Sequence, residues 1–238
     1  MESSLIHIQS FNKKGWGVGP SDKGAIEVFG ALPAEEVQVG LGRWRRGKCR
    51  GELEEVIKPS ESRVAPRCGH VAQCGGCVWQ QMEYGAQLRV KEERLRALFG
   101  EGVLRPIIAC EDPWQYRNKM EFSFSQNKAG ERFLGLVIAG SRGHVLNLQE
   151  CHLVSPWFIE VLTAVRKWWE GSGLDAYRRN DTGALRTLIV REGKRTGDKL
   201  VMLTVSGNPA FAMNKAQIQG FMEAMTGGKE RVARFLRV

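Results

Sequence analysis

The stretch CGHVAQCGGCVWQQ, residues 68–81, divides the chain into two parts of different character. It holds three of the six cysteines of the 238-residue chain, with the spacing C-x5-C-x2-C. Residues 59–81 show neither the alternation of a strand nor the period of a helix, and Gly75 and Gly76, between two of the cysteines, suit a tight turn. We therefore expect irregular chain that is held by ligands on the thiols rather than by a hydrophobic core.

A zinc ion or an iron–sulfur cluster would need a fourth ligand besides Cys68, Cys74 and Cys77. On residue chemistry alone the two groups fit equally well, because zinc usually takes paired C-x2–4-C knuckles and only one such pair is present. Cys151 is the favoured fourth ligand, because it lies in a loop between an expected strand and an expected helix. The other candidates are Cys49, His70 and Cys110. Reduced thiols without a ligand are a further interpretation.

Length and composition point to a soluble protein of two domains. The 238 residues exceed the usual domain size of about 100–150 residues. No run approaches the roughly 18 apolar residues of a membrane span, and the start, MESSLIHIQS, lacks the features of a signal peptide. We expect no membrane partner and a cytoplasmic location, where clustered cysteines bind metal more often than they form disulfides.

Charge favours a nucleic-acid partner. The net charge is +9, and five basic residues and one tryptophan fall within RWRRGKCR, residues 43–50. Basic side chains neutralise phosphates, and a tryptophan can stack on an unpaired base. The alternative is a solvated hairpin tip with a core tryptophan. The candidate RNA-binding residues of this segment are Arg43, Trp44, Arg45, Arg46 and Lys48.

The first 58 residues predict a small β-barrel. Short segments of partial alternation, separated by Gly, Pro and Asp, indicate four or five strands, an arrangement typical of OB-type barrels. Residues 82–99 carry leucines at helical spacing and are expected to form a helix that ends at Gly100.

From about residue 106 onward the pattern mixes strands and helices. Strands are expected at 120–125 and in the segments LRTLIVREG and KLVMLTVSG, and a hairpin is expected across GSRG. SPWFIEVLTAVRKWWEG, residues 155–171, predicts a helix with Ser155 as N-cap and Pro156 at the first helical position. NKAQIQGFMEAMTGG predicts a second helix, and VARFLRV a last strand that needs a partner.

Several of these stretches resemble the RNA uracil-5-methyltransferases, in the branch with a TRAM domain and a 4Fe–4S cluster, which includes rRNA uracil methyltransferases. FGALPAEEVQVGLGR resembles the TRAM signature, and the segment around the three cysteines resembles the cluster segment. YRNKMEFSFS (116–125), LQECHLVSP and LRTLIVREG resemble parts of the central domain. The resemblance implies an α+β chain with a TRAM-like barrel at 1–58, a cluster segment and helix at 59–105, and a central α/β domain at 106–238.

The resemblance also implies functional residues. It makes Cys68, Cys74, Cys77 and Cys151 ligands of a 4Fe–4S cluster, and it turns the barrel and the YRNK segment toward RNA, either rRNA or tRNA. We expect Arg117 and Lys119 to contact RNA. The alternative for these two residues is an ion pair with a nearby acid such as Glu111 or Glu121.

In the family, the central domain is followed by a Rossmann-like domain that binds S-adenosylmethionine and carries a nucleophilic cysteine. No cysteine follows Cys151, and no Gly-rich cofactor turn is visible. We therefore expect the methyltransferase domain to be absent, with S-adenosylmethionine bound only in that missing domain, and the chain to be a monomeric, truncated RNA-binding part without catalytic residues of its own. A separate chain could supply the methyltransferase half. The alternative is a stand-alone RNA-binding protein with an iron–sulfur cluster or zinc.

Overall fold

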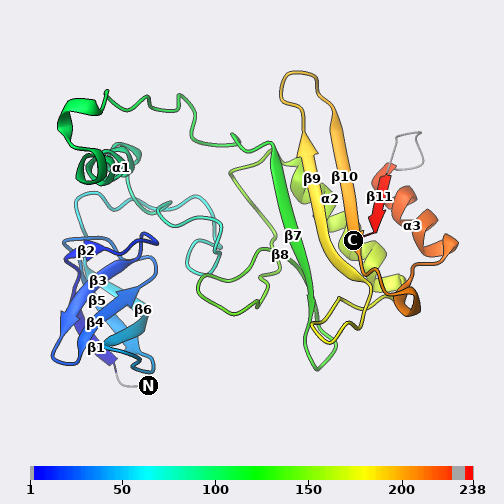
Figure 1. Ribbon diagram of the computed structural model, residues 1–238, viewed down its shortest axis with the longest axis horizontal. Coiled ribbons are helices and arrows are strands. Elements are labelled where there is room, and N and C mark those ends of the chain that lie inside the picture. Colours follow the sequence, from blue (N-terminus) through cyan, green and yellow to red (C-terminus); the bar gives the residue numbers. More distant parts are fainter. Residues whose placement is uncertain (1–2, 227–233, 238) are drawn as a thin grey trace. The chain divides into compact units, whose positions relative to one another are not determined.

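The computed structural model describes residues 3–226 and 234–237. The chain forms two compact units, one of residues 1–72 and 77–111, and the other of residues 73–76 and 112–238 (Figure 1). Within the described residues, no helix combines the length and the apolar composition that crossing a membrane requires.

The first unit contains a six-stranded sheet with the order β1-β5-β6-β4-β3-β2. Only β4 and β6 pair in parallel; the other neighbours are antiparallel. The sheet curls back on itself, so that the chain at and after β1 meets β3 near the other edge of the sheet. Gln9 N–H donates to Val18 O at 2.9 Å, and a Cβ on Gly19 would lie 2.3 Å from Ile6 Cγ2. The strands are β1 (Ser3–His7), β2 (Ser10–Phe11), β3 (Gly17–Ser21), β4 (Gly24–Val28), β5 (Glu36–Leu41) and β6 (Lys48–Lys58).

Alternation along these strands fills the interior of the barrel. Side chains that point inward, two residues apart, form one apolar cluster, as expected for strands with one buried face. The cluster consists of Ile6, Ile8, Ile26, Val28, Ala31, Val37, Val39 and Cys49. The strands expected from the sequence are thus present, and the Gly-rich segment at 17–21, for which the sequence predicted no strand, is β3.

A buried ion pair joins the barrel to the start of the cysteine segment. The Glu35 side chain is fully buried and accepts hydrogen bonds from Leu32 N–H at 2.8 Å and from the Arg63 guanidinium. Arg63 also donates to Gly30 O at 2.7 Å. Two segments 28 residues apart in sequence are therefore fixed together, and both carboxylate oxygens of Glu35 accept from the Arg63 guanidinium.

Helix α1 (Tyr84–Phe99) packs against one end of the barrel. Leu32, Met82 and Ala86 form a small buried cluster, and Trp79 donates from Nε1 to Gly15 O at 2.8 Å. The helix ends at Gly100, whose φ of +79° is left-handed, as the sequence predicted. A 3-10 turn, η1 (Glu101–Val103), follows.

The second unit is a five-stranded sheet with two helices on one face. The sheet order is β11-β10-β9-β7-β8, and only β10 and β11 are parallel. Figure 1 shows α2 behind β9 and β10. The elements are β7 (Lys119–Gln126), β8 (Arg132–Gly135), α2 (Trp157–Gly171), β9 (Leu185–Glu192), β10 (Lys199–Val205), a 3-10 turn η2 (Pro209–Phe211), α3 (Lys215–Thr226) and β11 (Arg234–Arg237).

One face of this sheet forms the main core with α2 and α3. Phe122 and Leu188 are fully buried against Phe158 and Leu162 of α2, and Phe221 of α3 packs in the same cluster. The strand expected at the end of the chain has its partner, because β11 pairs with β10. The rest of that expected segment, at 232–233 and 238, lies outside the described residues.

The start of α2 differs from the prediction. Ser155 does not cap the helix: its Oγ is buried without a hydrogen-bond partner, and the helix begins at Trp157, after Pro156. Phe158 N–H instead donates to the backbone oxygen of Ser155 at 3.1 Å. A backbone turn with proline therefore starts this helix in place of a side-chain cap.

Candidate nucleic-acid interface and cysteine segment

Residues 43–50, which we call the basic hairpin, connect β5 to β6 through a tight turn. Arg45 and Lys48 exchange both backbone hydrogen bonds, at 2.8 and 3.1 Å, and Arg46 and Gly47 both have positive φ, +51° and +70°. Such a two-residue turn matches the twist of the strands it joins. Gly47 O accepts from Ala25 N–H at 3.0 Å, so the tip is also fixed to β4.

The side chains of this hairpin divide into two groups. Arg43, Arg45 and Arg46 are exposed, and no ion pair is found for them in the described part of the chain. Trp44 is half-buried and packs against the barrel core, and Lys48 pairs with Glu27 at 2.9 Å. The three arginines are therefore available to a ligand, whereas Trp44 and Lys48 have structural contacts.

Arg117 and Lys119 lie just before and at the start of β7. Lys119 pairs with Glu121 at 2.6 Å, which is the alternative that the sequence left open. Arg117 is half-buried, with its guanidinium 5.9 Å from the Tyr116 ring centre and 3.7 Å from Met120 Sδ. Neither side chain is as open to a ligand as the hairpin arginines are.

Cys68 and Cys77 belong to the first unit, where the Gln80 side chain connects them. Its Oε1 accepts from Cys68 N–H at 2.8 Å, and its Nε2 donates to Cys77 Sγ at 3.6 Å. An amide that both accepts and donates holds the two cysteines in one local arrangement. The sequence analysis assigned no role to this glutamine.

Cys74 and Cys151 belong to the second unit and pack against its main core. Cys74 forms a β-bridge with Ile138, and its Sγ accepts from Gly76 N–H at 3.4 Å. Gly75 is needed because a Cβ there would lie 2.7 Å from Val137 O. Residues 73–76 are therefore positioned by backbone pairing with the segment that follows β8.

Two of the alternative ligands have other surroundings. Cys49 is buried in the barrel, and its Sγ donates to Gly42 O at 3.3 Å. Cys110 is exposed, and its N–H donates to Tyr84 Oη at 2.9 Å. Among the described residues, no group of three or more His, Cys, Asp or Glu side chains is arranged to hold a metal ion. The burial of Cys49 and its hydrogen bond to Gly42 O make it a residue of the barrel core.

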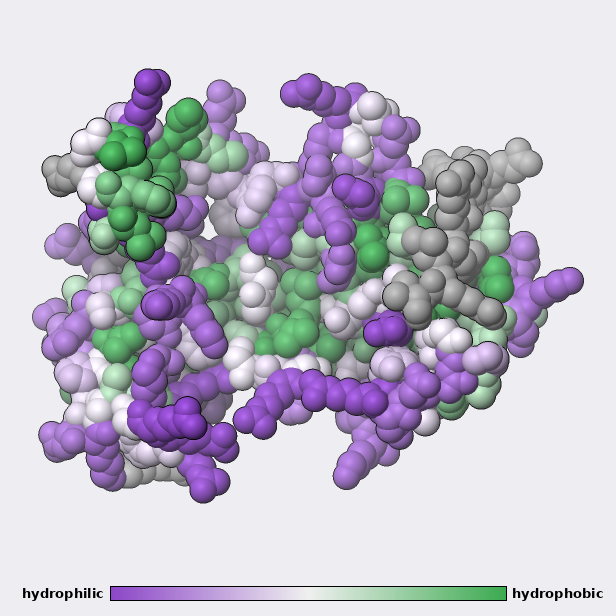
Figure 2. Space-filling model, in the orientation of Figure 1, coloured by the Kyte–Doolittle hydropathy of each residue, from purple (hydrophilic) through white to green (hydrophobic). Residues whose placement is uncertain are grey.

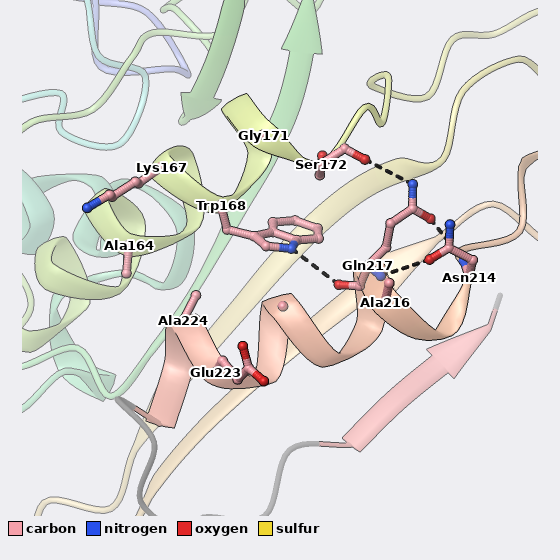
Figure 3. A pocket seen from close by; sticks show the side chains of 11 residues that line it. Ala164, Lys167, Trp168, Gly171, Ser172, Asn214, Ala216, Gln217, Glu223 and Ala224 are labelled. Atoms are coloured by element: carbon pink, nitrogen blue, oxygen red, sulfur yellow. Dashed lines mark hydrogen bonds between the residues drawn. The ribbon is translucent and has the colours of Figure 1, made fainter.

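A groove of about 780 Å³ lies between α2 and α3 (Figure 3). Trp168 Nε1 donates to Gln217 O at 3.2 Å, and Gln217 Nε2 donates to Ser172 O at 2.9 Å. Asn214 and Gln217 also exchange hydrogen bonds at 2.9 Å. These polar groups bind one another, so the groove is explained by helix packing. Its lining residues include Ala164, Lys167, Gly171, Ala216, Glu223 and Ala224.

Comparison with known proteins gives relatives but no matching family model. An uncharacterized RNA methyltransferase of Protochlamydia amoebophila is 42% identical over 224 residues, which cover 90% of this chain and 51% of that protein. One from Caldanaerobacter subterraneus is 30% identical over 86% of this chain and 47% of its own length. The chain thus spans about half the length of these relatives.

The fold is also known from a solved structure, that of Pyrococcus abyssi tRNA (uracil-54, C5)-methyltransferase in complex with S-adenosyl-L-homocysteine. The two superpose with a TM-score of 0.68 at 21% identity, over 91% of this chain and 48% of that one. This likeness contradicts the prediction that the methyltransferase domain is absent. The sequence reasoning was wrong because it searched only for a Gly-rich cofactor turn and a late cysteine, which say nothing of the fold that the chain does have. The chain is similar in sequence to proteins named RNA methyltransferases, and nearly all of it shares the fold of a tRNA (uracil-54, C5)-methyltransferase.

Proposed function

We propose that this chain functions in the S-adenosylmethionine-dependent methylation of uracil C5 in RNA, either tRNA or rRNA, and that it binds the RNA. The observation that carries the proposal is the 42% identity, over 90% of the chain, to a protein named an RNA methyltransferase. The uracil specificity and the methyl donor are inferred from the solved relative of the same fold, whose name gives uracil C5 and whose ligand is S-adenosyl-L-homocysteine.

The test is the 5-methyluridine content of cellular RNA. A strain that lacks the gene should lose 5-methyluridine from one RNA class, and a plasmid copy of the gene should restore it. Nucleoside mass spectrometry of separated tRNA and rRNA measures this loss and also shows which class is the substrate. Unchanged 5-methyluridine in both classes would overturn the proposal.

The hairpin arginines supply a binding surface for the RNA in this proposal. Arg43, Arg45 and Arg46 are exposed on a fixed turn. Log affinity falls linearly with log salt concentration, and each phosphate contact makes this negative slope steeper by about 0.7–0.9. A triple change of these arginines to alanine should therefore make the slope shallower by about 2 to 3. Salt titrations of RNA binding measure this effect.

A triple change on α1 provides the matched control. Arg89, Lys91 and Arg96 are exposed, and their change to alanine removes the same charge from the same unit. It should alter the slope far less than the hairpin change does. Equal effects of the two triple variants would indicate a general field of positive charge rather than a contact at the hairpin.

We also propose that Cys68, Cys74, Cys77 and Cys151 hold a 4Fe–4S cluster. Thiolate ligands of such clusters accept hydrogen bonds that tune them, and Cys74 and Cys77 each have an N–H group within 3.6 Å of Sγ. Protein purified without oxygen should contain four iron and four sulfide per chain. Cys74→Ala should lose them, whereas the exposed Cys110→Ala should keep them.

The alternative group is zinc. If the purified protein contains one equivalent of zinc and no iron or sulfide, the four cysteines form a zinc site. If it contains neither iron nor zinc, the cysteines are reduced thiols without a bound metal. Limited proteolysis gives an independent readout, because binding to the folded protein alone stabilises it. Cys74→Ala should make residues 59–81 more sensitive to protease, and unchanged resistance would count against any bound group.

A further inference from the structure

A turn at the start of β9 carries three exposed arginines. Residues 177–186, which we call the arginine turn, form a small hairpin in which Arg178 N–H donates to Thr182 O and Tyr177 N–H donates to Leu185 O, both at 2.8 Å. Arg178, Arg179 and Arg186 are exposed.

The backbone of the arginine turn is held in one conformation. Asp181 has a φ of +61° and Gly183 a φ of +83°, and a Cβ on Gly183 would lie 2.2 Å from Ala176 O. Asn208, outside the turn, donates from Nδ2 to the backbone oxygen of Asp181 at 3.3 Å and to its carboxylate at 3.2 Å. The arginines are thus displayed from a fixed support, which lowers the entropy lost when they bind a ligand.

The arginine turn also keeps its positive charge. For Arg178, Arg179 and Arg186, the described residues provide no ion pair. Asp181 is the one acid within residues 177–186, and Asn208 binds its carboxylate. The Arg186 guanidinium lies 4.6 Å from the Tyr177 ring centre, and such stacking covers a face of the guanidinium while its N–H groups stay at the edge.

Strand β9, which follows the turn, contributes to the face of the sheet that α2 and α3 leave uncovered. On that face Ile189 and Met202 are cross-strand partners that stay outside the buried core. At the far end of β9, Arg191 is exposed and pairs in register with Lys119. Arg186 and Arg191 are five residues apart, which is about 16 Å along a strand. Figure 2 shows this mixed face, with hydrophilic residues along its lower edge.

We propose that the arginine turn is a second RNA-binding site, at which Arg178, Arg179 and Arg186 bind phosphate groups. The proposal rests on RNA being the substrate, as proposed above. Guanidinium groups bind phosphate oxygens through paired N–H donors, and a basic cluster without acidic partners suits a polyanion. The backbone of one RNA strand then crosses the open sheet face, from the arginine turn toward Arg191.

Salt titration of RNA binding tests the site. The probe is an unmodified, fluorescently labelled tRNA transcript, and the protein is the full chain with the double change Arg178→Ala and Arg179→Ala. Loss of two phosphate contacts should make the slope shallower by about 1.4–1.8 and weaken binding about tenfold at moderate salt. An Arg-to-Lys double variant should restore the slope, because lysine keeps the charge.

Matched variants separate a contact from a general charge effect. Lys128→Ala with Arg142→Ala removes the same charge from exposed positions of the same unit and should change the slope by less than half as much. Asn208→Ala removes the support of Asp181 in the turn, so it should weaken binding. Because it leaves every charge in place, the slope should stay near that of the wild type. This last result would mark Asn208 as a positioning residue.

The outcomes distinguish the two proposals. If the wild-type chain binds the transcript and the Arg178/Arg179 variant binds it with the same affinity and slope, the arginine turn is not a phosphate site, while the proposed function stands. If the wild-type chain binds the transcript no better than a basic protein of equal charge, both fail. Unchanged circular dichroism melting of the variant shows that it is folded.

Discussion

Arg63 and the arginine turn place the same side chain in opposite settings. The Arg63 side chain is only 21% exposed and has a carboxylate and a carbonyl as partners, whereas Arg178 and Arg179 are exposed without an ion pair in the described part of the chain. A buried, paired charge fixes two segments to each other, and an exposed, unpaired one remains available to a ligand. The difference teaches that burial and pairing, rather than local charge density, separate structural cations from candidate binding residues.

The largest expected effect is at Arg63. Arg63→Ala leaves the fully buried Glu35 carboxylate without its counter-charge, and removal of one partner of a buried pair costs about 3–5 kcal/mol. Urea unfolding of the whole chain should show that loss of unfolding free energy. Arg89→Ala is the control, because its pair with Glu83 is 3.8 Å long and exposed. A similar small loss for both variants would remove the contrast between buried and exposed cations.

Arg166 on α2 should follow in size. Its guanidinium donates to Leu134 O at 2.8 Å and to Leu148 O, and burial lowers the pKa of this side chain. Arg166→Ala removes both of these hydrogen bonds, although Leu134 O still accepts from Leu148 N–H at 3.3 Å, and the expected loss is about 2–3 kcal/mol. The neighbouring Lys167 is exposed, so Lys167→Ala should be nearly neutral in the same urea titration. If the Lys167 variant lost as much, the carbonyl contacts would not explain the effect.

A smaller loss is expected at Arg132 of β8, whose guanidinium lies at the C-terminal end of α2. It donates to Trp169 O at 2.9 Å and Glu170 O at 3.0 Å, and its guanidinium lies 5.4 Å from the Trp169 ring centre. A cation there contacts the last carbonyls of the helix and the negative end of the helix dipole. Arg132→Ala should lower the unfolding free energy by about 1–2 kcal/mol. Arg178→Ala should leave it within about 0.5 kcal/mol, and a larger change would show that the arginine turn is structural.

The sequence predicted the regular elements well because their signals are local. Alternation indicated β7 and β9, helical spacing indicated α1, and Gly100 marked the end of that helix. The Glu35–Arg63 pair was missed because the two residues are 28 positions apart and no periodicity connects them. Tertiary contacts of this kind decide which charges are used within the fold.

Local charge density was also an incomplete guide to the binding surface. It drew attention to the run at 43–50, within which Lys48 has an acidic partner, Glu27, on the neighbouring strand β4. The arginine turn was overlooked because its third arginine is separated from the other two by a turn. The usable signal was the segment YRRNDTGALR, in which turn-forming residues bring Arg186 back beside Tyr177.

Two carboxylates extend the comparison to pH. Glu35 is buried with Arg63, whereas Glu83 is exposed as the N-cap of α1, accepting from Gly85 N–H at 2.9 Å and Ala86 N–H at 2.8 Å. Those two backbone hydrogen bonds, more than the nearby Arg89, hold the pKa of Glu83 below its ordinary value of 4.5. A depressed pKa in the folded state means stability that is present above pH 4.5 and is lost as the pH falls through the folded value.

The smallest effect is therefore expected from Glu83→Gln, which keeps an acceptor oxygen but removes the charge. The variant should melt slightly below the wild type near neutral pH, and the two melting temperatures should converge as the pH falls below about 4.5. Thermal melts of both proteins from pH 6 to 3 measure the difference. A difference that stayed constant over this range would mean that the carboxylate stabilises α1 by packing or geometry and not by its charge, which would place Glu83 with the structural groups despite its exposure.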